Sequence, residues 1–377
     1  MKKLLAGILA LALCSTNMPP QTIFAEEFTS GNQDVVSEEE TPEIFTNEEQ
    51  EAAGETNEDL FVFSSEEAPE FNDTPDEAMA ATENAQNGVI DLADNNNVPD
   101  GVYTISSAGD YKFTCSRETG NRIVVDGKKI SAKDSINIYL NKVNINTSAG
   151  PALRINLNVE ATVTIHLTGT NSLITKNNYY AGLQKDNEAQ LIITNASDTT
   201  TGILKASSDG SGYGAGIGSG NYGSCKNITI NSGFVDAKSK FGAGIGSGHQ
   251  GSCDNITIKS GSVNAKSMNG AGIGGGGYFS CSNITIKSCS VIASSKYGAG
   301  IGGGKQGIGS NITIKSASVT ASSTDGAGIG GGGYGASSVS GITINSSSVT
   351  ASSTNGAGIG GGGYGADSVS DITINSS

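Results

Sequence analysis

The pentapeptide Gly-Ala-Gly-Ile-Gly recurs six times in the second half of the chain, beginning at Gly214, Gly242, Gly270, Gly298, Gly326 and Gly356. The first five copies are 28 residues apart, and the sixth follows after 30. A constant period of this length is typical of proteins built from stacked structural repeats. The chain is therefore expected to form an elongated array over this stretch, with each repeat contacting its neighbours.

Each period contains the same three short apolar pieces, separated by Gly, Ser and Asn. They are the pentapeptide itself, an Ile-Thr-Ile segment (Ile228 to Ile230 in the first copy) and a Val-x-Ala segment (Val235 to Ala237). Short apolar alternations bounded by turn residues indicate strands, and no segment of the repeat has helical periodicity. The sequence thus predicts an all-β fold, a right-handed parallel β-helix with three short strands per coil of 28 to 30 residues.

Stacking of coils is required because one coil has too few aliphatic side chains to form a core alone. Residues of equal phase should then lie about 4.8 Å apart along the axis. Two rows are expected to point inward, Ile228, Ile256, Ile284, Ile312, Ile342 and Ile372, and Val235, Val263, Val291, Val319 and Val349. An asparagine row is expected at a turn, where the side chain bonds its neighbour and the backbone; it comprises Asn227, Asn255, Asn283 and Asn311.

Two segments precede the predicted solenoid. Residues 1–25 have the lysines, short apolar run and cleavage region of a signal peptide, and that run is too short to span a bilayer. Residues 26–100 contain 23 acidic residues and no Lys or Arg, so we expect a disordered acidic linker. These acids account for the net charge of −15. The chain from residue 101 is mildly basic, and no motif there favours nucleic acid.

The predicted solenoid covers residues 101–377, with a cap at 101–135, irregular coils to residue 212 and regular repeats over 213–377. Its spacing predicts about nine coils, roughly 45 Å of stack. The chain ends directly after an Ile-Thr-Ile segment, in the middle of a coil. We therefore expect a truncated solenoid, with a C-terminal cap or cell-wall anchor beyond residue 377.

Three cysteines, Cys225, Cys253 and Cys281, share one phase of the repeat. In-phase stacking would bring their Cα atoms within the range of a disulfide. The pattern favours a buried row of small residues and leaves open whether one pair is oxidised. No C-x-x-C pair is present to suggest a redox or metal site.

Other candidate sites have weak support in the sequence. Two G-x-G-x-x-G matches lack the helix and the acidic residue of a dinucleotide site. One calcium-type nonapeptide includes Asp367, but calcium needs six or more oxygen ligands, so calcium is only an open alternative and no cofactor is expected. The only histidines, His166 and His249, lie about three coils apart, and the aspartates are scattered in phase. No catalytic set is predicted.

One row in the turn after the pentapeptide favours binding. Five residues beyond each pentapeptide isoleucine stand Tyr222, Gln250, Tyr278, Gln306, Tyr334 and Tyr364. Tyrosines two coils apart would be about 10 Å apart, on the scale of a disaccharide. Aromatic faces with amide groups suit sugar rings, although the same tyrosines also suit a purely structural turn cover. A second, less regular row precedes the pentapeptide: Tyr213, Phe241, Asn269, Tyr297, Asp325 and Asn355. The Gly and Ala of the pentapeptide are expected to form an open strip.

Several motifs carry a resemblance to a known group of proteins. They are residues 163–171 (Val-Thr-Ile-His-Leu-Thr-Gly-Thr-Asn), 180–184 (Tyr-Ala-Gly-Leu-Gln), 191–194 (Leu-Ile-Ile-Thr) and the repeated Gly-Ala-Gly-Ile-Gly with Asn-Ile-Thr-Ile. The stretch 101–377 resembles secreted carbohydrate-binding parallel β-helix domains, similar in fold to pectate lyases, and the GAGIG-repeat surface proteins of clostridia and other Firmicutes. The resemblance implies a secreted or cell-surface protein and a glycan partner.

The sequence therefore favours a non-catalytic, adhesin-like module that binds a polysaccharide or a host or plant glycan along the Tyr/Gln row. Two alternatives stay open. One is a polysaccharide lyase-like enzyme acting on an acidic glycan, and the other is a passive spacer in a large surface protein.

Overall fold

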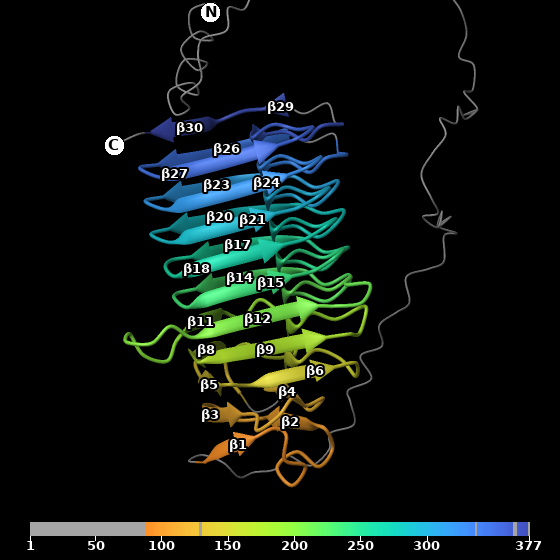
Figure 1. Cartoon of the computed structure of the whole chain (residues 1–377), viewed down its shortest axis with the longest axis vertical. Coiled ribbons are helices and arrows are strands. Elements are labelled where there is room, and N and C mark those ends of the chain that lie inside the picture. Colours follow the sequence, from red (N-terminus) through yellow and green to blue (C-terminus); the bar gives the residue numbers. More distant parts are fainter. Residues whose placement is uncertain (1–87, 128–129, 336–337, 365–367, 376–377) are drawn as a thin grey trace, which may run out of the picture. The chain divides into compact units, whose positions relative to one another are not determined.

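The computed structural model describes residues 88–127, 130–335, 338–364 and 368–375. The predicted signal peptide and most of the predicted acidic linker lie outside these residues. The described chain is a parallel β-solenoid of about nine turns, in which three parallel sheets run along the axis (Figure 1). Successive strands of each sheet come from successive coils, which confirms the predicted fold class with three strands per coil.

The first sheet carries the Ile-Thr-Ile segments, and we call it the Ile-Thr-Ile sheet. Its strands are β1 (Val89–Asp91), β3 (Gly109–Thr114), β5 (Ser135–Asn141), β8 (Thr162–Thr168), β11 (Leu191–Asn195), β14 (Cys225–Ile230), β17 (Cys253–Ile258), β20 (Cys281–Lys287), β23 (Gly309–Lys315), β26 (Ser338–Asn345), β29 (Ser368–Val369) and β30 (Ile372–Asn375). Both β29 and β30 pair with β26.

The second sheet carries the pentapeptides and is called the GAGIG sheet. Its strands are β2 (Val102–Ile105), β4 (Arg122–Val125), β7 (Leu153–Ile155), β10 (Leu183–Lys185), β13 (Ile217–Gly218), β16 (Ile245–Gly246), β19 (Ile273–Gly274), β22 (Ile301–Gly302), β25 (Ile329–Gly330) and β28 (Ile359–Gly360). The repeats thus have only two-residue strands here, because glycine at either side of the isoleucine interrupts the regular extended backbone.

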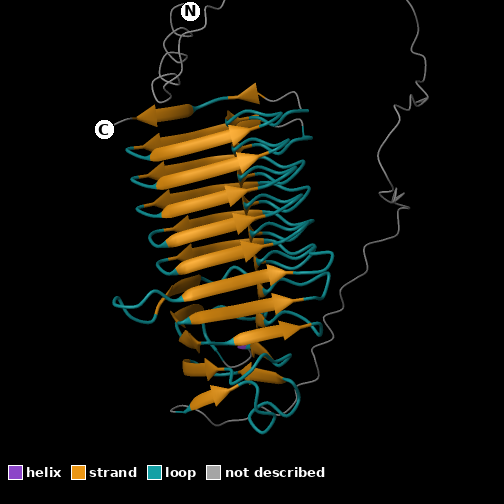
Figure 2. Cartoon of the chain, viewed as in Figure 1, coloured by secondary structure: helices purple, strands orange, loops and turns teal. Residues whose placement is uncertain are grey.

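The third sheet carries the Val-x-Ala segments and is called the Val-x-Ala sheet. Its strands are β6 (Asn144–Thr147), β9 (Thr170–Thr175), β12 (Ile203–Ser208), β15 (Phe234–Lys238), β18 (Ser262–Lys266), β21 (Ser290–Ser294), β24 (Ser318–Ser323) and β27 (Ser348–Ser353). The loops that join this sheet to the GAGIG sheet, and those that follow the GAGIG strands, stack along one edge (Figure 2).

The predicted rows are in register. Ile228 pairs with Ile256 and Val235 with Val263, and the coils above repeat the pairing. The isoleucines from Ile228 to Ile342 are fully or almost fully buried, whereas Ile372 in the edge strand β30 is 36 % exposed. The core is therefore a column of aliphatic side chains running along the axis.

The asparagine row lies at a left-handed bend in each coil. Asn227 and Asn255 have φ of 59° and 57°, a conformation that asparagine adopts more readily than most residues. The Asn255 side chain donates to Oδ1 of Asn227 at 2.6 Å, and Asn311 donates to Asn283 at 3.3 Å. Between these pairs, Asn283 donates to Asp254 instead, at 2.7 Å. The row is confirmed, with Asp254 inserted into its hydrogen bonding.

The pentapeptide does not form the open strip that the sequence suggested. Gly242 to Gly246 are all buried, and Ala243 is completely covered. A Cβ added to Gly244 would lie 2.7 Å from the carbonyl oxygen of Gly272 in the next coil. The glycines are needed because the solenoid's own backbones approach one another here, so no external ligand has access to this strip.

The ordered fold begins before residue 101. Strand β1 pairs with β3, and Leu92 and Val98 are buried against the first coils. The polar run of residues 94–97 forms a turn, which hid these apolar residues from the linker boundary placed at residue 100. Residues 101–135, expected as a cap, instead contain the paired strands β2, β3 and β4.

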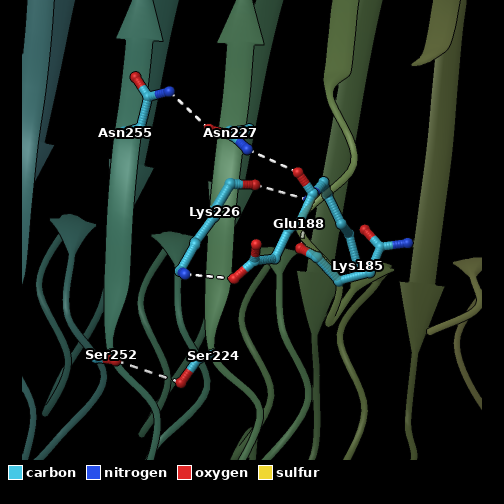
Figure 3. A network of polar contacts seen from close by, with 8 residues as sticks. Lys185, Glu188, Ser224, Lys226, Asn227, Ser252 and Asn255 are labelled. Atoms are coloured by element: carbon cyan, nitrogen blue, oxygen red, sulfur yellow. Dashed lines mark hydrogen bonds and ion pairs between the residues drawn. The ribbon is translucent and has the colours of Figure 1, made fainter. Parts of the chain in front are cut away.

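The change from irregular to regular coils occurs around a buried lysine. Lys185 is 0 % exposed and lies in register with Ile155 of the coil below. Its Nζ donates to the carbonyl oxygens of Asn187 and Lys226 at 2.7 and 2.6 Å, and burial lowers its pKa. Glu188 accepts from Lys226 at the surface of the same network (Figure 3).

Candidate functional site

The two turns that flank each GAGIG strand meet at one edge of the solenoid. The backbone N–H of Gly277, after one pentapeptide, donates to the carbonyl of Phe241, before the previous one, at 3.1 Å. Gly333 donates to Tyr297 in the same way at 2.9 Å. The Tyr/Gln row and the second row therefore form one continuous surface, which we call the aromatic strip. Its members are Tyr222, Gln250, Tyr278, Gln306, Tyr334, Tyr364, Tyr213, Phe241, Asn269, Tyr297, Asp325 and Asn355.

The Tyr/Gln row is aligned in phase, as predicted. The N–H of Tyr278 donates to the carbonyl of His249 at 3.2 Å, and that of Gln306 to Gly277 at 3.1 Å. The N–H of Tyr334 donates to Lys305 at 2.9 Å. The tyrosine side chains are exposed by 43 % at Tyr222, 37 % at Tyr278, 40 % at Tyr334 and 60 % at Tyr364. Each ring therefore keeps a solvent-accessible part.

The residue immediately before this row explains why tyrosine alternates with glutamine. In the middle coils that position is His249, Gly277, Lys305 and Gly333, so a large side chain precedes glutamine and a glycine precedes tyrosine. A Cβ on Gly277 would lie 2.4 Å from Cδ2 of His249. Glycine thus leaves room for the large side chain of the coil below, and the tyrosine ring of its own coil covers that side chain.

The contacts follow this two-coil pattern. The Tyr278 ring lies 4.7 Å from the His249 ring, and the Lys305 ammonium lies 4.7 Å from the Tyr334 ring centre. The tyrosines therefore do pack on the turn, as the structural interpretation required. They also remain partly exposed, and successive alternating tyrosines stand two coils apart, about 10 Å at strand spacing.

The N-terminal half of the strip is purely aromatic. The Tyr213 ring stacks on Phe241 at 4.8 Å and on Tyr179 at 6.0 Å, and His249 contacts both Tyr213 and Phe241. Tyr179 is 48 % exposed and extends the strip by one coil. Sequence reasoning missed it because the loop before β10 breaks the 28-residue spacing. Its signal was the Tyr-Tyr-Ala-Gly-Leu segment, which matches the residues before each pentapeptide.

His249 is the most shielded polar group of this half. It is 7 % exposed, and burial, assisted by the positive charge of Lys305, lowers its pKa to about 4. The imidazole is therefore neutral at neutral pH and acts as an aromatic partner of its neighbours. A neutral ring packed among aromatic residues contributes apolar surface to the strip rather than charge.

The C-terminal half adds charged and polar groups to the rings. Asp325 is 6 % exposed, and its carboxylate accepts from the Tyr334 hydroxyl at 2.9 Å and from Nδ2 of Asn355 at 2.7 Å. Burial and this hydrogen bond raise the pKa of Tyr334 to about 12. Tyr364 stacks on Tyr334 at 4.9 Å. The rings are thereby held in fixed orientations by polar partners.

The scattered acidic and imidazole groups do not assemble into a reaction centre. His166 stacks on Tyr139 at 4.3 Å, far along the sequence from His249. Asp236 pairs with Lys238, and Asp254 accepts from Ser282 and Asn283. Within the described ranges, no three His, Cys, Asp or Glu side chains are placed to hold a metal ion. Asp367 of the calcium-type nonapeptide lies outside the described residues.

The cysteine row contains one disulfide. Cys225, Cys253 and Cys281 are paired in register, and Cys253 is bonded to Cys281 with a Cα–Cα distance of 4.6 Å. Cys225 is a free thiol that is 1 % exposed, and burial raises its pKa to about 12. Such a thiol is almost entirely protonated and therefore a poor nucleophile at neutral pH.

Among the described residues, no helix has the length and apolar character to cross a membrane. A family model described as "Beta helix repeat" matches five stretches of the chain, residues 228–249, 256–277, 284–305, 312–333 and 342–363. No curated protein and no solved structure matches the chain. The regular coils of this solenoid are thus similar in sequence to β-helix repeats.

Proposed function

We propose that the aromatic strip binds a polysaccharide lying along the solenoid axis. The protein would then be a secreted or cell-surface module that holds glycan without cleaving it. The observation that carries this proposal is the two-coil alternation, which leaves tyrosine rings 37–43 % exposed at Tyr222, Tyr278 and Tyr334. Their repeat of about 10 Å is close to the length of a disaccharide in an extended glycan.

The chemistry of the strip supports a saccharide ligand. Aromatic faces cover the apolar face of a pyranose ring, and glutamine amides both donate to and accept from its hydroxyls. Gln306 is exposed and Gln250 is half-buried between the tyrosine coils. The polar partners of Tyr334 and Tyr364 limit ring rotation, and preorganised rings lose less conformational entropy on binding.

The localisation is part of the same proposal. The N-terminal sequence supports secretion. The Cys253–Cys281 disulfide supports an oxidising environment, where such bonds persist. The partner would be a polysaccharide of a host, a plant or a neighbouring cell, and attachment to the cell wall would need residues beyond those given.

Binding to immobilised polysaccharides tests the proposal. We expect the full chain to be retained on at least one of cellulose, xylan, chitin and polygalacturonate. Replacing both Tyr278 and Tyr334 by Ala should weaken that binding about tenfold or more, because each lost ring contact contributes on the order of 1 kcal/mol. Phe234→Ala is the matched control, since Phe234 is 36 % exposed but lies on the Val-x-Ala sheet.

Two outcomes would contradict this proposal. Retention of no polysaccharide would favour the spacer alternative. Binding that both tyrosine substitutions leave unchanged would place the ligand elsewhere. Calcium-dependent release of unsaturated sugars from polygalacturonate would favour the lyase-like alternative instead.

A further inference from the structure

A recess of about 500 Å³ lies over the N-terminal end of the Val-x-Ala sheet, outside the aromatic strip. One wall is the segment from Cys115 to Glu118, and the other includes Lys142. The wall segment follows β3 and forms a parallel bridge between Thr119 and Ile145, so it runs beside β6 as an incomplete extra strand. The volume is in the range of sites that hold small organic ligands.

The floor of the recess is a polar row on three consecutive coils. Asn144 of β6 pairs in register with Ser172 of β9, which pairs with Lys205 of β12. These positions point outward, because their neighbours Ile145, Leu173 and Leu204 are buried in the core. The row spans about 10 Å at strand spacing. It offers an amide, a hydroxyl and an ammonium group to one ligand.

The walls contribute two further cations and one carboxylate. Arg117 uses one Nη2 hydrogen to bond the carbonyl oxygen of Ala93 at 2.9 Å, which fixes the guanidinium beside the recess. Lys142 has a φ of 56°, and its stem lies over Gly169, where an added Cβ would meet Cγ of Lys142 at 3.3 Å. Glu118 accepts from Nδ2 of Asn146 at 3.2 Å.

The charges of the recess are unbalanced. Arg117, Lys142 and Lys205 face it with Glu118 as the single carboxylate. In the described part of the chain, the ion pairs involve Lys226 and Lys238, and neither Lys142 nor Lys205 has a carboxylate partner. Two unpaired ammonium groups next to hydroxyl and amide donors make a site for an oxyanion, since lysine binds such groups as a point charge.

We infer that this recess binds a small hydroxylated oxyanion of the sugar-acid class. Lys142 and Lys205 would hold the negatively charged group, and Asn144 and Ser172 would bond the hydroxyls. The inference does not depend on the aromatic strip, which lies along a different edge and presents rings rather than a cluster of cations.

Isothermal titration of the full chain with glucuronate tests the inference. We expect saturable binding of glucuronate, competition by inorganic sulfate and no detectable binding of glucose. The double variant Lys142→Gln/Lys205→Gln should bind glucuronate at least tenfold more weakly. The control Lys259→Gln/Lys287→Gln removes the same charge from exposed positions beside the Ile-Thr-Ile sheet and should bind as the wild type does.

A Tyr278→Ala/Tyr334→Ala variant should also bind glucuronate normally, which separates this site from the strip. The inference is overturned if glucuronate does not bind or if glucose binds equally well. It is also overturned if the Lys142/Lys205 variant keeps full affinity. Equal loss in the Lys259/Lys287 control would show that net charge, rather than the recess, attracts the ligand.

Discussion

Gly274→Ala should prevent the regular coils from stacking, with a loss of more than about 4 kcal/mol in the free energy of unfolding or a failure to fold. Gly274 has a φ of +141°, which L-residues rarely adopt, and its added Cβ would lie 1.9 Å from the carbonyl oxygen of Gly302 in the next coil. That carbonyl accepts the N–H of Gly275 at 2.9 Å, so it cannot move without breaking the stack.

Two matched substitutions separate the causes of this loss. Gly360 has nearly the same φ, +134°, but its added Cβ would have no neighbour closer than 3.5 Å. Gly360→Ala should therefore cost only the backbone strain, about 1–3 kcal/mol. Gly120→Ala, with neither constraint, should be nearly neutral. Urea unfolding followed by circular dichroism measures all three. Equal stability of Gly274→Ala and Gly120→Ala would contradict the close stacking of the GAGIG strands.

Acid should destabilise the aromatic strip through His249. Its pKa is about 4 in the folded protein, lowered by burial and by Lys305, whereas an unfolded histidine has a pKa near 6.5. The unfolded state therefore binds the proton more strongly between these values. The stability is fully present above pH 6.5 and is lost as the pH falls towards 4, by about 3 kcal/mol in total.

The variant His249→Phe isolates this effect, because it keeps an aromatic ring against Tyr213, Phe241 and Tyr278 but cannot be protonated. Its unfolding free energy should fall less than that of the wild type between pH 7 and pH 4.5, by about 2 kcal/mol or more. His166, whose pKa burial also lowers, remains in both proteins, so its contribution cancels. Identical pH dependence of the two proteins would exclude His249 as the acid-sensitive group.

The period of the repeat was sufficient to predict most of the fold. Because the pentapeptide isoleucines recur every 28 residues, the three strands of each coil, the inward Ile and Val rows and the in-phase Tyr/Gln row could all be read from spacing. Features that depend on close approach could not. The burial of Gly242–Gly246 follows from the distance between backbones of adjacent coils, which spacing does not specify.

Other features of the site depend on contacts between residues that no motif connects. The two turn rows merge because Gly277 bonds to Phe241 across coils, and the recess forms because the segment after β3 turns back beside β6. The cysteine spacing allowed two disulfides, Cys225–Cys253 or Cys253–Cys281, and the structure has the second. The reason for tyrosine–glutamine alternation, by contrast, was legible in the preceding row of His, Lys and Gly.

The spacing of the tyrosines can be changed without changing their number. Deleting residues 270–325 removes two coils, and deleting 270–297 removes one. Both deletions keep Tyr222, Tyr334 and Tyr364 and join Asn269 to a pentapeptide glycine. In the longer deletion Tyr334 follows the His249 coil directly, so the two-coil spacing from Tyr222 is restored. In the shorter one the Lys305 coil intervenes, and the spacing becomes three coils.

The affinity of these two deletion proteins for the polysaccharide that the full chain retains tests the central claim most directly, once circular dichroism shows that both are folded. Recognition by ring spacing predicts that the shorter protein, lacking residues 270–325, binds more tightly than the protein lacking 270–297. Tighter binding by the longer protein, or equal binding by both, would contradict a glycan site built on the two-coil repeat.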